Sequence, residues 1–387
     1  MMLRMIVLMR NRYRNSYSYM NIRIGIIAII SVVFVSCSTS KSTNYLVGTY
    51  TDSESQGINV VQFNEESKAI SVQKVVSGIE NPSFVIANKA KTIVVSVEET
   101  ASKDGGKVTS YSYDSNSNTF TKLSSFFTKG DHPCTVAFSP KEDFIVVGNY
   151  SGGNLTVFPI DKSGNLSESV KSIQFEGQSS NSERQEKPHV HCIVFHPKEN
   201  KMFVADLGRD VIEIIPFDEN SKAFLQSDKS VAVKVVAGSG PRHLVWNKAG
   251  TRLYVTFELT NEVGVFDYKN NQLIPVQTIV LTKEKTTGST AELRLSNDEN
   301  FLYASVRGVD NHIVVMKIAD DKLEKIQTIL TERTPRNFII SENQKYVLVA
   351  SQGSNLISVF DRNKKKGLLT KTSHSVSINK PVYLFSF

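Results

Sequence analysis

A short motif built around a turn, usually with a proline, recurs roughly every fifty residues and constrains the fold more than any other feature. Each copy opens a short apolar segment. Six copies contain the proline, and they begin at Asn81, His132, Pro188, Gly240, Thr334 and Lys380. The long gap before the fifth of these copies is divided by Ser289-Thr290-Ala291-Glu292, which lacks the proline but keeps the apolar segment. The chain therefore contains seven repeated units.

Each unit follows the same pattern of short strands. In the unit that opens at His132, an apolar alternation over 136–138 precedes a turn at 139–143, and further strands follow over 144–148 and 155–159. Short strands rich in β-branched and aromatic residues, with turns about every 8–12 residues, are typical of all-β folds. Four strands per unit at this period predict a seven-bladed β-propeller with four-stranded antiparallel blades.

The two ends of the repeat region are expected to share one blade. The last unit, 381–387, has room only for an inner strand, and the segment 45–50 can supply a strand that is missing from that blade. Joining both ends in one sheet removes the open edges that a linear stack of blades would expose. The sequence therefore predicts a closed ring over residues 44–387, folded as one domain.

The first 36 residues predict an export signal. They contain five arginines and no acidic residue, and their apolar run over 24–35 is too short to span a bilayer. The run ends at Phe34-Val35-Ser36-Cys37, which resembles the bacterial lipobox, whose cysteine is lipidated and becomes the first residue. We expect a lipoprotein signal peptide over 1–36, a polar tether over 37–43, and an exported periplasmic protein whose only membrane contact is the lipid on Cys37.

Two alternatives stay open at the N-terminus. Met20 could be the true start, because the segment from Met20 to Cys37 alone makes a compact signal. The apolar run could also act as a membrane-anchoring helix.

Charge and cysteine content exclude several classes of function. The formal net charge is +7, and the five arginines of the signal leave about +2 for the rest of the chain. A nucleic-acid partner would require a clustered basic surface, and a net charge this close to zero gives no support to such a partner. Cys134 and Cys192 are expected to be buried and free of a disulfide, and no metal-ligand spacing is present. The sequence predicts a monomer without cofactor or metal.

Several further motifs recur in the order expected of one known family. They are Tyr45-Leu46-Val47-Gly48-Thr49-Tyr50, Asn149-Tyr150-Ser151-Gly152-Gly153, Arg184-Gln185, Pro188-His189-Val190-His191, Asp206-Leu207-Gly208, Gly240-Pro241-Arg242-His243, Glu258-Leu259 and Ser305-Val306-Arg307-Gly308. Together they resemble the seven-bladed lactonase family, which includes the propeller-type 6-phosphogluconolactonases and the fungal muconate-lactonizing enzymes. The resemblance runs from about Tyr45 to Phe387.

The resemblance implies a catalytic group drawn from separate repeats. Its members are His191, Arg242, Glu258 and Arg307, with His189 beside them. A neutral imidazole can take a proton from water, and a guanidinium can stabilise the oxyanion formed when a lactone is attacked. Whether His189, His191 or Glu258 is the base stays open. The remaining expected substrate-binding residues are His243, Glu292, Arg336 and Asn149.

Three functions compete. The first is metal-independent hydrolysis of a sugar lactone, phosphorylated or not. The second is a cycloisomerase that closes an unsaturated diacid to a lactone, and the third is a propeller that only binds a ligand or protein. Charge clustered on the ring axis would favour an enzyme, whereas charge spread over the rim would favour a binding scaffold.

Overall fold

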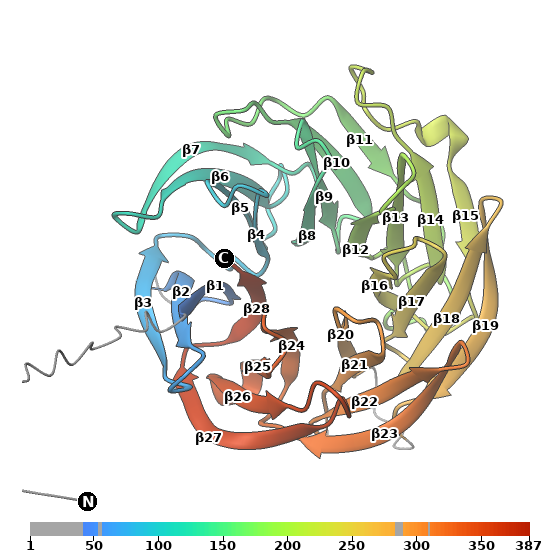
Figure 1. The fold of residues 1–387 in the computed structure, drawn as a ribbon. Helices are drawn as coiled ribbons and strands as arrows, with labels where there is room; N and C mark the ends of the chain where they lie inside the picture. Colours follow the sequence, from blue (N-terminus) through green and yellow to red (C-terminus); the bar gives the residue numbers. More distant parts are fainter. Residues whose placement is uncertain (1–41, 53–55, 283–288, 309) are drawn as a thin grey trace, which may run out of the picture. The chain divides into compact units, whose positions relative to one another are not determined.

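Seven four-stranded antiparallel sheets surround a central axis in the computed structural model (Figure 1). The structure describes residues 42–52, 56–282, 289–308 and 310–387. The predicted all-β, seven-bladed propeller is confirmed. The predicted signal peptide, the lipidation site Cys37 and nearly all of the tether lie outside the described residues.

From the axis outwards, blade 1 contains β28 (Pro381–Ser386), β1 (Ser42–Thr49), β2 (Gly57–Asn64) and β3 (Ile70–Ser77). Blade 2 contains β4 (Val85–Ala87), β5 (Ile93–Glu98), β6 (Lys107–Asp114) and β7 (Thr119–Phe127). Blade 3 contains β8 (Pro133–Phe138), β9 (Phe144–Asn149), β10 (Asn154–Pro159) and β11 (Lys171–Gln174). Blade 4 contains β12 (Val190–Phe195), β13 (Lys201–Asp206), β14 (Val211–Pro216) and β15 (Val231–Lys234).

Blade 5 contains β16 (Pro241–Trp246), β17 (Arg252–Phe257), β18 (Glu262–Lys269) and β19 (Gln272–Val280). Blade 6 contains β20 (Thr290–Leu295), β21 (Phe301–Val306), β22 (His312–Ala319) and β23 (Lys322–Leu330). Blade 7 contains β24 (Pro335–Ile340), β25 (Tyr346–Ser351), β26 (Leu356–Arg362) and β27 (Leu369–Ser377). Two 3₁₀ turns, Ser227–Lys229 and Gln352–Ser354, are the helical elements of the described chain.

The ring is closed by pairing the two ends of the propeller in blade 1. The last strand, β28, lies antiparallel to β1, with Leu46 opposite Phe385 and Gly48 opposite Tyr383. This confirms the predicted closure.

Burial along a strand depends on its distance from the axis. Every residue of β9 is buried, because this strand packs on neighbouring blades through both of its faces. The outermost strands β11 and β27 alternate between more and less buried residues, since much of one face meets solvent. This explains why the apolar segments near the start of each repeat were visible in the sequence, whereas the outer strands were seen only as polar tails.

Within the described ranges, Cys134 and Cys192 are free, as predicted, but only Cys134 is buried, whereas Cys192 is partly exposed. The same ranges contain no group of three or more His, Cys, Asp and Glu side chains arranged to hold a metal ion. They also contain no helix with the length and apolar character needed to cross a bilayer.

Candidate active site

A β-bulge near the start of the inner strand turns one residue of each affected blade towards the axis. The pairing of β12 with β13 skips a residue between Val190 and Cys192, and that of β24 with β25 skips one between Pro335 and Asn337. Bulges commonly re-aim a side chain next to an active site. The first residues inside these irregularities, here called the bulge positions, are Cys134, His191, Arg242, Ala291, Arg336 and Val382.

A second set of residues immediately follows the second strand of each blade. The backbone N–H of Glu258 donates to the carbonyl of Gly240 at 2.8 Å, and that of Arg307 donates to the carbonyl of Ser289 at 2.9 Å. The same hydrogen bond recurs in all seven blades. Its donors, here called the post-strand positions, are Tyr50, Glu99, Tyr150, Leu207, Glu258, Arg307 and Gln352.

Gly240 shows why this backbone arrangement requires particular residues. Its φ of +64° lies in the left-handed region, and a Cβ there would come within 2.6 Å of the side chain of Leu259. Glycine therefore allows the chain to turn into Pro241 and to present Arg242 to the axis.

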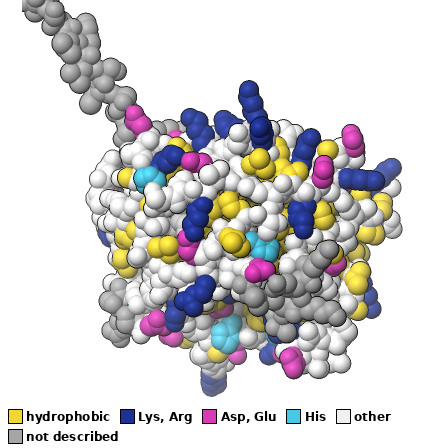
Figure 2. Space-filling model, turned by 90° about the horizontal axis from the view of Figure 1, so that it is seen from below, with side chains coloured by type: hydrophobic (Ala, Val, Ile, Leu, Met, Phe, Trp, Pro, Cys, Tyr) yellow, Lys and Arg dark blue, Asp and Glu magenta, His cyan; other side chains and the backbone are white. Residues whose placement is uncertain are grey.

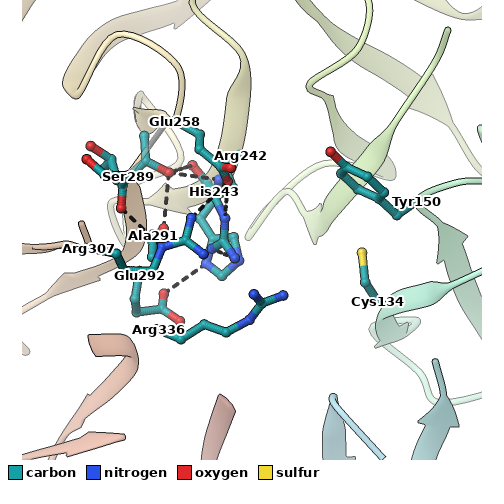
Figure 3. Close-up of polar contacts among 12 residues, drawn as sticks. Cys134, Tyr150, Arg242, His243, Glu258, Ser289, Ala291, Glu292, Arg307 and Arg336 are labelled. Carbon is teal, nitrogen blue, oxygen red and sulfur yellow. Dashed lines mark hydrogen bonds and ion pairs between the residues drawn. The ribbon is translucent and has the colours of Figure 1, made fainter. Parts of the chain in front are cut away.

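The two sets together enclose a polar cavity of about 330 Å³ on the axis. Eight of its nine lining residues come from bulge or post-strand positions, and Arg184 comes from the loop before β12. In Figure 3, Cys134 and Tyr150 face Arg242 and Arg336 across an open space. The lining residues are Glu99, Cys134, Tyr150, Arg184, His191, Arg242, Glu258, Arg307 and Arg336.

Three arginines converge on the Glu258 carboxylate. Arg184 lies 2.8 Å from Oε1, while Arg242 and Arg307 lie 2.6 Å and 3.3 Å from Oε2. Burial alone would raise the pKa of Glu258, but the charges of Arg307, Arg242 and Arg184 outweigh it and lower that pKa to about 2. Glu258 is therefore a permanent carboxylate that holds the guanidinium groups in place, and it is a poor acceptor for a proton from water.

His191 has the properties of a proton acceptor. Its side chain is buried at the cavity wall, and its Nδ1 has no hydrogen-bond partner among the described residues. Burial, together with the positive charge of Arg242, holds the pKa of His191 well below its usual value. The imidazole is therefore neutral at pH 7, and in this form it can accept a proton through the ring nitrogen that carries no hydrogen.

His243 contacts Arg242, and Glu292 contacts His243, but neither residue lines this cavity. Nη1 of Arg242 lies 3.0 Å from Nε2 of His243, and Nδ1 of His243 lies 3.1 Å from the Glu292 carboxylate (Figure 3). This geometry fits a His243 that donates through Nδ1 to Glu292 and accepts from Arg242. Both residues line a separate cavity of about 510 Å³ with mainly apolar walls.

His189 and Asn149 also lie outside the cavity lining. The ring of His189 stacks on Tyr150 at 4.3 Å between centroids, and its Nδ1 lies 3.0 Å from the Tyr150 carbonyl oxygen. Asn149 is fully buried and donates to the carbonyl of Thr128. Both residues position the segment that carries Tyr150. Two residues that are two positions apart on a regular strand share one face, but His189 precedes β12 and His191 sits at the bulge, so this rule does not apply to them.

Sequence reasoning missed four residues of the lining as site members: Glu99, Cys134, Tyr150 and Arg184. Tyr150 and Arg184 lie within motifs that were recognised, but neither was assigned a role. A signal for Glu99 was present, because it directly follows the strand Ile93–Glu98 as Glu258 directly follows Arg252–Phe257. Aligning the repeats on their second strands would have found it.

The comparisons with known proteins agree with this architecture. A family model described as lactonase, 7-bladed β-propeller, matches residues 44–385. The chain belongs to this lactonase family. The 6-phosphogluconolactonase of Bacillus subtilis is 30% identical to this lactonase-family chain over 349 residues, which cover 88% of the chain and 97% of the relative.

Two crystal structures resemble this member of the lactonase family over nearly its whole propeller. A proposed 6-phosphogluconolactonase from Bacteroides fragilis is 34% identical, with a TM-score of 0.85, and the match covers 90% of this chain and 99% of that one. The periplasmic gluconolactonase of Pseudomonas aeruginosa is 31% identical, with a TM-score of 0.83, and the match covers 89% of this chain and 98% of that one.

Proposed function

We propose that this chain hydrolyses a sugar lactone, with His191 activating water and Arg242 and Arg307 stabilising the carbonyl oxyanion. The observation that carries the proposal is the neutral imidazole of His191 in the wall of a cavity lined by four arginines. Membership of the lactonase family, together with relatives named for lactone hydrolysis, supports an enzyme of this class.

The location of charge supports an enzyme over a binding scaffold. Four guanidinium groups face two carboxylates within the axial cavity, so the cavity has an excess of positive charge. On the side of the molecule drawn in Figure 2, basic, acidic and hydrophobic side chains are interspersed. A cavity of this charge suits an anionic substrate, because a guanidinium binds phosphate or carboxylate through paired hydrogen bonds.

In the proposed reaction, His191 takes a proton from a water molecule, and the oxygen of this water attacks the carbonyl carbon of the lactone. The developing oxyanion lies against Arg242 or Arg307, which are fixed by Glu258 and need no rearrangement during the reaction. Glu258 is assigned to positioning, because its three ion pairs make it a weak base.

A pH-stat assay of the purified protein tests this function. With gluconolactone, 6-phosphogluconolactone and muconolactone as substrates, we expect acid release above the spontaneous rate, with the highest kcat/KM for the phosphorylated lactone because of the excess positive charge. His191→Ala should abolish most of this release. Turnover of muconolactone alone would instead support the cycloisomerase, and spontaneous rates with all three would support a binding propeller.

We also propose that the chain is exported and anchored through a lipid on Cys37. The lipobox-like sequence motivates this, and the periplasmic location named for the Pseudomonas aeruginosa relative supports export. We expect Cys37→Ala to move the protein from the membrane fraction to the soluble fraction, with Ser36→Ala as the matched control. If Cys37→Ala stayed in the membrane fraction, a helical anchor would be the better explanation.

A further inference from the structure

The axial cavity contains a second carboxylate, Glu99, which lies across the ring from Glu258. Both occupy post-strand positions, Glu99 after β5 in blade 2 and Glu258 after β17 in blade 5. Three blades is the largest separation that a seven-membered ring allows. Both side chains line the same cavity, so a substrate held there lies between two acidic groups.

The two carboxylates have opposite surroundings. Glu258 has three arginine partners, whereas no Lys or Arg nitrogen among the described residues lies within 4.0 Å of the Glu99 carboxylate. Glu99 instead lies against the hydroxyl of Tyr50, at 2.9 Å and 3.0 Å from its two oxygens. That hydroxyl also accepts a hydrogen bond from Arg336 at 2.9 Å.

We propose that Glu99 is a further catalytic residue, the acid that protonates the ring oxygen of the lactone as the ring opens. This inference rests on the proposed function. It gives the reaction a proton donor on the wall opposite the arginine cluster that positions the carbonyl oxygen.

The electrostatics of the cavity support this division of roles. Burial raises the pKa of Glu99, and the charge of Arg336, the nearby Ser83, the hydrogen bond from Tyr50 and the nearby His132 only partly offset it. The pKa of Glu258 is lowered to about 2 in the same cavity. Two carboxylates whose surroundings push their pKa values apart are the usual arrangement of an acid and a permanent anion. The buried thiol of Cys134 also faces Glu99, but burial keeps it protonated.

The step balances with water as the only co-reactant. A lone pair of the water oxygen forms the new bond to the carbonyl carbon while His191 takes the water proton. The bond between that carbon and the ring oxygen then breaks, and its electron pair leaves with the oxygen. Glu99 supplies the proton that this oxygen needs to become a hydroxyl. The proton on His191 returns to Glu99 through solvent in the cavity, which restores both groups.

The test compares pH profiles of kcat and KM for wild type, Glu99→Gln and a matched control, Glu98→Gln. Glu98 is the adjacent carboxylate, lies 4.0 Å from Lys107 and is not part of the cavity lining. We expect Glu99→Gln to lower kcat about a hundredfold, with KM changed less than about threefold, and to lose the alkaline limb of the profile. Glu98→Gln should retain kcat within about twofold of wild type.

A second variant keeps the inference falsifiable if Glu99→Gln folds poorly. Tyr50→Phe removes the hydroxyl that stabilises the Glu99 carboxylate, so the pKa of Glu99 should rise and the alkaline limb should move to higher pH. An unchanged alkaline limb in both variants, or kcat within about threefold of wild type in Glu99→Gln, would overturn the role of Glu99. Lack of lactone hydrolysis by the wild type would instead reject the proposed function itself.

Discussion

Replacing Arg242 with alanine is expected to reduce kcat/KM for lactone hydrolysis by a factor of about a hundred or more. Removing one donor that stabilises an oxyanion costs roughly 2.7–4 kcal/mol of transition-state binding. Arg307→Ala should have an effect of the same size, because both guanidinium groups line the cavity beside the same carboxylate. Steady-state kinetics on the best substrate of the pH-stat assay provide the measurement.

These variants should lose much catalytic activity and little folding stability. When either arginine is removed, Glu258 keeps two of its three guanidinium partners. Arg252→Ala is the matched control, because Arg252 belongs to the same blade as Arg242 and pairs with Asp267 at 2.7 Å, but it is not part of the cavity lining. Full activity in a stable Arg242→Ala or Arg307→Ala protein would remove that arginine from the site. An activity loss that followed the folded fraction would make its role structural.

Replacing Glu258 with glutamine is expected to destabilise the protein by about 3–5 kcal/mol, the usual cost of leaving buried charges without their partner. The change preserves shape but leaves Arg184, Arg242 and Arg307 without a carboxylate in common. Denaturant unfolding should be measured without phosphate or sulfate, since an anion bound among the arginines would replace the lost charge.

The same comparison has a defined pH dependence. Because folding lowers the pKa of Glu258 from 4.5 to about 2, its contribution to stability is present above pH 4.5 and is lost as the pH falls towards 2. The difference in unfolding free energy between wild type and Glu258→Gln should shrink over that range. Asp143→Ala is a control, since its partner Lys162 is 83% exposed and the pair should contribute less than about 1 kcal/mol. A difference that did not vary with pH would contradict the proposed role of this carboxylate.

The propeller could be predicted because the sequence pattern that indicates it is local and is repeated in each unit. The turn prolines mark the inner strands, and an incomplete final unit with an unassigned strand at 45–50 predicts the closure that β1 and β28 make. Arg242, Glu258 and Arg307 could also be placed on the axis, since each follows or opens a recognisable apolar strand.

The finer geometry of the site could not be predicted, because it depends on bulges. Strict alternation of faces along a strand places His189 and His191 alike, whereas the bulge at His191 leaves the His189 ring stacked on Tyr150 and the His191 ring edge-on to it. The ion pairs of Glu258 also depend on Arg184, whose loop has no strand pattern to fix its position. Composition and periodicity do not determine how far such a loop reaches over the axis.

Closure of the ring between β1 and β28 has a consequence for the order of events during folding. The first blade cannot be completed until Pro381–Ser386, near the end of the chain, has been synthesised and has returned to the strand formed by Ser42–Thr49. Contacts between distant parts of a sequence form slowly, because the intervening chain must first be ordered. Until β28 has paired with β1, the other blades can therefore form only an open ring.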